Sequence, residues 1–209
     1  MNPIISAQHL SKQYRVHRGR PDSLKEAVVR RKKNRSSSEF WALKEVSLDI
    51  EKGSFFGLIG HNGSGKTTLL KLMAGIHNPS SGQLKVNGRV SALLELGSGF
   101  HPELSGRENI YLNGAILGLT RKEMDLAVDE IIEFSDIGEF IDAPVKILSS
   151  GMYVRLGFAV AVHVAPEILL IDEVIAVGDE AFQRKCLEHL YELRRAGTTI
   201  VLVSHSLPL

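Results

Sequence analysis

Residues 60–67 read Gly60-His61-Asn62-Gly63-Ser64-Gly65-Lys66-Thr67, which fits the phosphate-binding P-loop pattern G-x-x-x-x-G-K-[ST]. The apolar run 55–59 precedes this stretch, and the helix-like run 69–73 follows it. In such a strand–loop–helix setting, glycines let backbone N–H groups face phosphate oxygens at the positive end of a helix. Lys66 is expected to reach the outer phosphates and Thr67 to hold Mg²⁺. The pattern predicts a phosphate site formed by Gly60, Asn62, Gly63, Ser64, Gly65, Lys66, Thr67 and Thr68.

The length suits one large domain or one and a half small ones. The chain has 209 residues, enough to bury about 70% of its unfolded surface. Cys186 is the only cysteine, so no intramolecular disulfide can form, as is typical of a reducing compartment. Its apolar neighbours Phe182, Leu187 and Leu190 predict a buried thiol. No apolar run is long enough to cross a bilayer, and residues 1–5 lack the features of a signal peptide.

The charge of the chain is unevenly distributed. The net charge is +1, but residues 15–35 carry nine Lys or Arg against two Asp or Glu, so this segment is +7 and the remainder −6. A polar, basic insertion is therefore expected over 18–38, with a short amphipathic helix at 24–29. Such a block usually forms a solvated or interacting surface. A nucleic-acid role is disfavoured because no aromatic platform accompanies the basic run.

Hydrophobic periodicity predicts alternating strands and helices. Helices are expected over 153–164, 181–195 and within 103–147, where Ser105–Glu108 and Thr120–Glu123 form capping boxes. Pro79 to Gly82 should form a turn, and Asn87-Gly88 is a hairpin-type dipeptide. Strands are expected over 4–16, 46–50, 55–59, 84–86, 90–96, 168–171 and 199–203. The alternation implies an α/β fold with a mostly parallel sheet covered on both faces.

Three polar residues follow two of these expected strands. The apolar run 169–171 ends in Asp172-Glu173, and an aspartate at such a strand end supports Mg²⁺ in P-loop proteins. Glu173 would then face the γ-phosphate and orient or deprotonate the attacking water. His205 follows the next strand and is a candidate neighbour of the same phosphate. The structural alternative is a strand followed by an acidic turn, with His205 as a polar boundary residue.

Together these motifs resemble the ATP-binding subunits of ABC transporters, over nearly the whole chain. Residues 148–152 read Leu-Ser-Ser-Gly-Met and stand where that family has its signature motif. Ser150 and Met152 depart from the commoner Gly and Gln. The resemblance implies a helix N-terminus that faces ATP bound to a second subunit, formed by Ser149, Ser150, Gly151 and Met152.

The resemblance also implies roles for single residues. Tyr14, at the end of the first strand, is implied to stack on adenine, although an ordinary strand tyrosine is the alternative. Asp179 is implied to lie in a loop that contacts the other subunit. Lys66, Glu173 and His205 are the implied catalytic residues, with ATP and Mg²⁺ as cofactors.

The family fold implied for residues 1–209 is one ABC nucleotide-binding domain. It is a P-loop NTPase fold with a mostly parallel sheet, an antiparallel β part and a helical subdomain inserted at 103–147. The family normally continues beyond the position of His205, so the chain looks shortened at its C-terminal end.

One element of the family pattern is absent. The family usually has a glutamine after the strand expected at 90–96, and the sequence contains none between Arg89 and Glu108. Glu95 or Leu96 stands near that position. Glu95 is therefore the candidate metal-site replacement, although a carboxylate behaves differently from an amide at a metal and water site.

Residues 95–110, 149–156 and 171–179 resemble the subfamily that exports polysaccharides. The resemblance implies an ATP-hydrolysing homodimer beneath a permease of two transmembrane subunits, peripheral to the cytoplasmic face of the bacterial inner membrane. The implied substrate is a lipid-linked O-antigen, capsule or teichoic acid glycan, moved outward. Residues 97–116 are implied to contact the permease. The basic residues of 18–35 either touch anionic lipid headgroups or the pyrophosphate of the substrate, or form a solvated loop.

Rival functions stay open at this point. A related transporter could move another membrane substrate. A soluble ABC-type ATPase of DNA repair or translation usually carries fused or tandem cassettes, whereas this chain has one. A regulatory module without turnover is disfavoured by intact Lys66, Asp172, Glu173 and His205.

Overall fold

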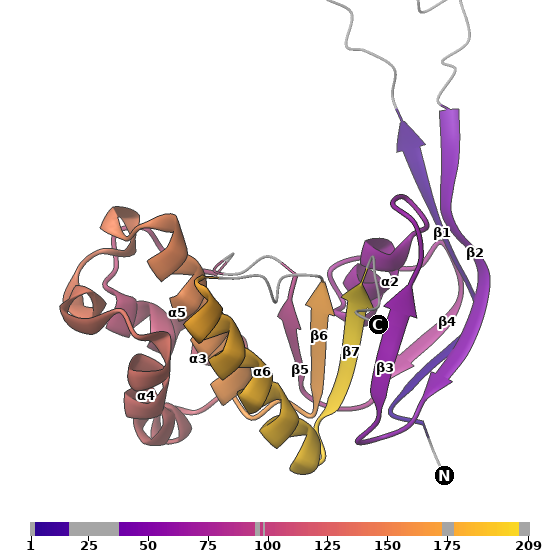
Figure 1. Cartoon of the computed structure of the whole chain (residues 1–209). Helices are drawn as coiled ribbons and strands as arrows, with labels where there is room; N and C mark the ends of the chain where they lie inside the picture. Colours follow the sequence, from indigo (N-terminus) through magenta and orange to yellow (C-terminus); the bar gives the residue numbers. More distant parts are fainter. Residues whose placement is uncertain (1–2, 17–37, 95–96, 98, 173–177, 205–209) are drawn as a thin grey trace, which may run out of the picture.

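The computed structural model describes residues 3–16, 38–94, 97, 99–172 and 178–204, arranged as two β-sheets and a group of helices (Figure 1). The antiparallel sheet has the order β2-β1-β4 and consists of β1 (Ile5–Val16), β2 (Ser38–Ile50) and β4 (Ser81–Val86). The parallel sheet has the order β3-β7-β6-β5 and consists of β3 (Phe55–Ile59), β5 (Val90–Leu93), β6 (Ile168–Asp172) and β7 (Thr199–Ser204). The predicted α/β fold with an antiparallel part is confirmed.

Strand β6 shows why the centre of the parallel sheet is apolar, since Ile168 to Ile171 are all buried. Ile168 and Leu170 pack with β1 and with α2 (Lys66–Met73), which lies between the two sheets (Figure 1). Leu169 and Ile171 point to the opposite face and pack against the helical side of the molecule. Successive side chains of a strand alternate between faces, so a strand covered on both sides must be apolar at every position.

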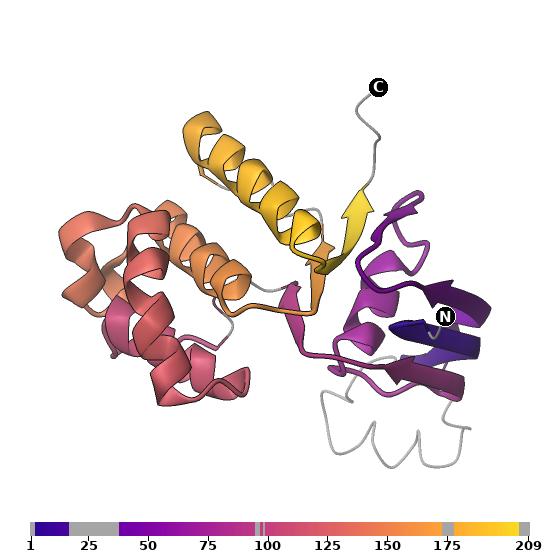
Figure 2. The ribbon, with the colours of Figure 1, turned by 90° about the horizontal axis from the view of Figure 1, so that it is seen from below.

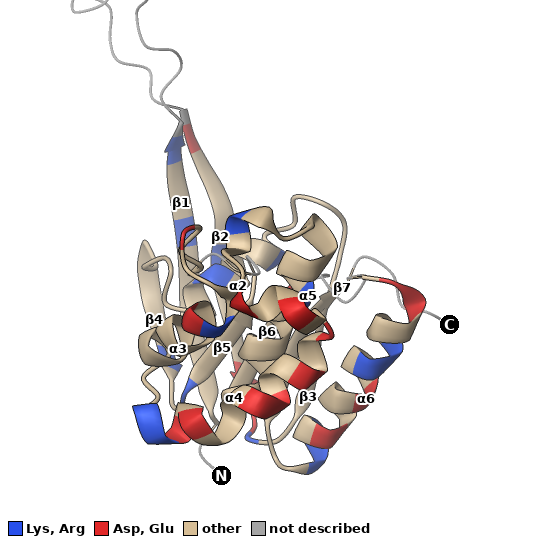
Figure 3. Cartoon of the chain, turned by 90° about the vertical axis from the view of Figure 1, so that its left-hand side faces the viewer, with Lys and Arg blue, Asp and Glu red and all other residues tan. Residues whose placement is uncertain are grey.

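In the described part of the chain, four α-helices follow β5. They are α3 (Gly106–Ile116), α4 (Arg121–Ser135), α5 (Ser150–His163) and, after β6, α6 (Glu180–Arg195). Two short 3-10 helices, η1 (Gly138–Asp142) and η2 (Val145–Ile147), lie between α4 and α5. Helices α3, α4 and α5 gather beyond β5, on the side away from the antiparallel sheet (Figures 1 and 2). Several of the Asp and Glu residues that make the chain outside residues 15–35 negatively charged lie along α4 (Figure 3).

Both predicted capping boxes are confirmed and define where α3 and α4 begin. The Ser105 hydroxyl accepts a bond from the Glu108 N–H, and the Glu108 carboxylate accepts one from the Ser105 N–H at 2.8 Å. Thr120 and Glu123 exchange the same pair of bonds at the start of α4. Each box satisfies N–H groups that the first turn of a helix leaves without partners.

Three local expectations are wrong. Asn87-Gly88 closes no hairpin, because β4 pairs with β1 whereas β5 pairs with β6 in the other sheet. Ser81 and Gly82, expected in a turn, begin β4; there Gly82 passes so close to His9 that a Cβ atom would lie 2.2 Å from its carbonyl oxygen. Strand β5 ends at residue 93 rather than 96. Pairing partners, which periodicity does not reveal, account for these differences.

Among the described residues, no helix combines the length and apolar character needed to cross a membrane.

Cys186 should be inert in the folded protein. It is 1% exposed on α6, and burial raises the pKa of its thiol to about 12. Because the thiolate is the reactive form, we expect no reaction with a thiol reagent in mildly alkaline buffer. After denaturation, one thiol per chain should react, as measured by absorbance of the released chromophore. Rapid labelling of the native protein would contradict the buried position.

Candidate functional site

A cleft of about 740 Å³ lies where strands of the parallel sheet end. Ile59, the last residue of β3, pairs with Ser204 at the end of β7, and Asp172 at the end of β6 pairs with Val203. The carboxyl ends of parallel strands thus meet at one edge, the usual ligand position in α/β folds. The described lining residues are Tyr14, Phe40, Ala42, Asn62, Gly63, Gly65, Lys66, Thr67, Thr68, Leu94, Asp172 and Val203.

Two glycines of the loop that precedes α2 have left-handed backbone conformations. Gly63 and Gly65 have φ values of 78° and 93°, a region that suits glycine. Gly65 is the N-cap of α2, which has no side-chain cap and no acidic residue in its first turn. The positive end of this helix is therefore uncompensated by its own side chains and is suited to an anion.

The Lys66 ammonium, which is predicted to contact the phosphates, lies against the backbone of the P-loop. It donates hydrogen bonds to the carbonyl oxygens of Gly60 and His61 at 2.7 and 2.9 Å. These bonds hold a positive charge beside the helix N-terminus, at the wall of the cleft. The loop thus offers backbone N–H groups, a helix end and a cation to one anionic ligand.

Gly65 also carries a packing constraint that Gly63 does not. A Cβ atom at Gly65 would lie 2.4 Å from the Ala42 carbonyl oxygen and 2.7 Å from the Leu43 side chain, whereas nothing lies within 4 Å at Gly63. We expect Gly65→Ala to lower the free energy of unfolding by about 2–4 kcal/mol, from overpacking plus left-handed backbone strain. Gly63→Ala should cost about 1 kcal/mol, from strain alone. Denaturant titration of both variants tests this, and equal losses would contradict the close approach.

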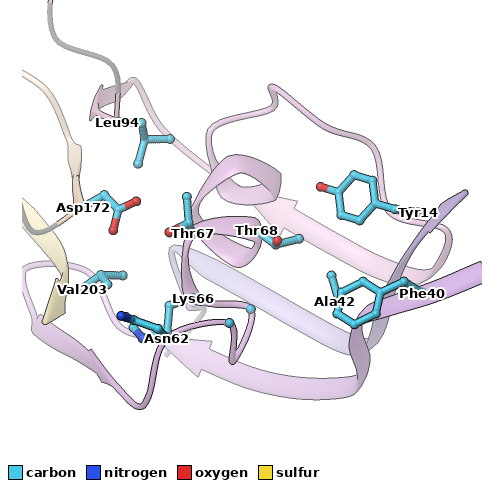
Figure 4. Close-up of a pocket in the computed structure, with 12 residues that line it drawn as sticks. Tyr14, Phe40, Ala42, Asn62, Lys66, Thr67, Thr68, Leu94, Asp172 and Val203 are labelled. Carbon is cyan, nitrogen blue, oxygen red and sulfur yellow. The ribbon is translucent and has the colours of Figure 1, made fainter. Parts of the chain in front are cut away.

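Thr67 and Asp172, the two residues predicted to hold Mg²⁺, both line the cleft. Figure 4 shows the Thr67 hydroxyl and the Asp172 carboxylate facing the same space from α2 and β6. Oxygen ligands suit Mg²⁺, which is usually held by few protein groups together with phosphates and water. Among the described residues, no three or more His, Cys, Asp or Glu side chains are grouped so that they could hold a metal ion by themselves. The residues present fit a magnesium nucleotide.

Three predicted site residues, Glu95, Glu173 and His205, lie outside the described residues. The basic segment 18–35 lies outside them too.

The residues of the expected signature motif do not line this cleft. Ser149 is the N-cap of α5, and its hydroxyl accepts a hydrogen bond from the Met152 N–H at 3.2 Å. Ser150 and Gly151 belong to the first turn, which contains no acidic residue. The helix end is therefore suited to an anion, although it does not face the cleft of its own subunit.

Asp179 is held by contacts within its own chain. It is the N-cap of α6, and its carboxylate accepts a hydrogen bond from the Phe182 N–H at 2.9 Å, which lowers the pKa of Asp179. Arg155 of α5 donates to Asp179 at 2.5 Å and to Asp136, the C-cap of α4, at 3.1 Å. Its guanidinium lies 5.0 Å from the Phe182 ring centre. Sequence reasoning missed Arg155, which ties three helices together.

Four lining residues were also missed: Phe40, Ala42, Leu94 and Val203. Two of them lie on β2, which begins at residue 38 although the alternating pattern indicates a strand only from residue 46. The signal available in the sequence was Phe40, an aromatic residue upstream of the apolar strand that leads to the P-loop. The strand that pairs with β2 is β1, which lies before residues 17–37, so the pairing could not be read from spacing.

Comparisons with known proteins agree with this geometry. A family model described as ABC transporter matches residues 43–176. The O-antigen export system ATP-binding protein RfbB of Myxococcus xanthus is 55% identical over 197 residues, 92% of this chain and 45% of that protein. RfbB of Klebsiella pneumoniae is 46% identical over 99% of this chain and 85% of its own length. The teichoic acids export ATP-binding protein TagH of Staphylococcus epidermidis is 42% identical, with 99% and 77% covered.

A solved structure shows the same fold. A dimeric, post-hydrolysis ATP-binding cassette bound to ADP and phosphate aligns with a TM-score of 0.76 and 21% identity, covering 97% of this chain and 88% of that one. The chain spans less than half the length of its Myxococcus relative, but the family model and the Klebsiella relative cover most of it. The chain therefore belongs to the ABC transporter family.

Proposed function

We propose that this chain is the ATP-hydrolysing subunit of an exporter that moves a lipid-linked polysaccharide outward across a bacterial membrane. The observation that carries the proposal is the convergence of Lys66, Thr67 and Asp172 at one cleft, in a chain whose relatives are named for O-antigen and teichoic acid export. An O-antigen, capsule or teichoic acid glycan is the corresponding substrate class.

Each part of the cleft has a task in this proposal. The P-loop N–H groups and Lys66 bind the phosphates, while Thr67 and Asp172 hold Mg²⁺, which neutralises charge on the β- and γ-phosphates when bound. Glu173 orients the attacking water and accepts its proton, and His205 contacts the γ-phosphate. Positioning and charge stabilisation supply most of the catalysis in phosphoryl transfer.

A second copy of the chain completes each site. The N-terminus of α5 suits an anion, and its residues Ser149 to Met152 do not line the cleft of their own subunit. In a homodimer, this helix end faces the γ-phosphate on the partner, so ATP favours the closed dimer and hydrolysis releases it. Asp179 lies at the start of α6, beside the loop implied to contact that partner.

The dimer works as a peripheral protein at the cytoplasmic face of the inner membrane, beneath two permease subunits. Residues 97–116 contact the permease in this arrangement. The basic segment 18–35 contacts anionic lipid, where each basic residue near the surface contributes about 1 kcal/mol.

Phosphate release and membrane association test the proposal. We expect the purified chain to release phosphate from ATP only with Mg²⁺, and to co-purify with a permease and polysaccharide-bearing lipid from membranes. A chain that hydrolyses ATP but stays free of every membrane complex would favour a soluble ABC ATPase instead. A chain that binds ATP without turnover would favour a regulatory module.

A further inference from the structure

The end of the cleft farthest from Asp172 is formed by the paired strands β1 and β2. Tyr14 of β1 lies directly opposite Phe40 of β2 in the antiparallel register. Directly opposite residues place their side chains on the same face of a sheet, with Cβ atoms about 4.5–5.5 Å apart. Ala42 lies where the register of β2 against β1 shifts by one residue, and Tyr14, Phe40 and Ala42 all line the cleft.

The Phe40 side chain does not contribute to the hydrophobic packing of the described residues. Its side chain is 56% exposed and belongs to neither hydrophobic core. The neighbouring Trp41 is also exposed, but it does not line the cleft. A large aromatic ring that faces a cleft without packing in the core is the kind of surface that ligands cover.

Tyr14, in contrast, is held by its surroundings. The Lys12 ammonium lies 5.3 Å from the centre of the Tyr14 ring, and the His77 ring meets it edge-on at 6.0 Å. Within the described part of the chain, no cation or second ring engages Phe40 in this way. Tyr14 is thus pre-positioned, while the Phe40 ring is available to a ligand.

The layout of the cleft determines what that ligand group is. Figure 4 shows Thr67 and Asp172 at one end, Tyr14 and Phe40 at the other, and the P-loop between them. A nucleotide whose phosphates lie on the P-loop and whose Mg²⁺ lies against Asp172 must direct its base toward the aromatic end.

We propose that Phe40 is a second aromatic contact for the nucleotide base, beside Tyr14; this inference rests on the ATP-binding function proposed above. The two rings and the Ala42 methyl group form an apolar wall that the flat base covers. A phenyl ring offers no hydrogen bond to distinguish one base from another, so Phe40 adds affinity for nucleotide bases in general.

Comparing two ligands separates a base contact from a structural role. ATP and inorganic tripolyphosphate, each with Mg²⁺, both use the P-loop, but only ATP has a base. We expect Phe40→Ala to weaken ATP binding roughly tenfold by calorimetry, the effect of losing one aromatic–base contact. The affinity for tripolyphosphate should stay unchanged, and Phe40→Tyr should restore ATP binding.

Trp41→Ala is the matched control, since it removes a larger exposed ring from the same strand at a position that does not line the cleft. It should leave both affinities unchanged. Unaltered ATP affinity in Phe40→Ala would overturn the proposal, and so would an equal loss for ATP and tripolyphosphate, which indicates a disturbed P-loop. If the unaltered protein bound tripolyphosphate but not ATP, the base contact would be wrong; if it bound neither, the proposed function itself would fail and this inference with it.

Discussion

Replacing Lys66 with alanine is expected to weaken ATP binding by on the order of a hundredfold. The ammonium bonds to Gly60 and His61 show that the side chain is already held at the phosphate loop, so little entropy is lost when it turns to a phosphate. A hydrogen bond to a charged group contributes about 1.5–3 kcal/mol, and 1.4 kcal/mol corresponds to tenfold in affinity. Calorimetric titration with Mg²⁺ and ATP measures the change.

Lys85→Ala serves as the control for Lys66→Ala. Lys85 is an exposed lysine of β4, in the antiparallel sheet and outside the cleft. The Lys85→Ala substitution removes one positive charge, as Lys66→Ala does, but at a position outside the cleft. It therefore shows how much of the affinity change comes from the lower net charge alone. Equal affinities in the two variants would contradict the P-loop assignment.

Glu173→Gln should keep ATP binding but lower turnover by roughly 10²–10⁴-fold, the usual contribution of a general base. The amide cannot take the proton of the attacking water, whereas every phosphate contact remains. The bound triphosphate then holds two copies together, and gel filtration with ATP and Mg²⁺ should show a stable dimer. Glu173 directly follows Asp172, at the strand end that reaches the cleft.

Two further variants make the dimer result specific. Adding Lys66→Ala to Glu173→Gln should return the protein to a monomer, because the trapped state needs bound ATP. Glu188→Gln, an exposed position on α6, should hydrolyse ATP at the normal rate. A Glu173→Gln protein that elutes only as a monomer, or that releases phosphate normally, would be incompatible with the proposed role.

Much of the fold was readable from local patterns. The P-loop between an apolar strand and a helix, together with later apolar strands separated by helices, predicted the parallel sheet. The expected cover on both faces holds for β6, whereas every second residue of β3 is exposed. The capping boxes at Ser105 and Thr120 predicted where α3 and α4 begin, because capping involves residues only three positions apart. Such features depend on neighbours in the chain, and neighbours are visible in a sequence.

Contacts between distant segments were not readable in this way. Arg155 bridges Asp136 and Asp179 across α4, α5 and α6, and no spacing rule connects these positions. Asn87-Gly88 has the composition of a hairpin turn, but the strands on either side belong to different sheets. In each case the partner is chosen by packing of whole elements.

The cleft depends both on local sequence motifs and on contacts between distant segments. Local patterns in the chain specified the groups proposed to bind phosphate and metal, since glycine spacing, Lys66, Thr67 and the carboxylate at a strand end each belong to a single motif. The aromatic end came from folding, because Tyr14 and Phe40 are brought opposite each other only by the pairing of β1 with β2. A motif contains the information for its own backbone shape, whereas the position of one motif against another depends on the buried surfaces that join them.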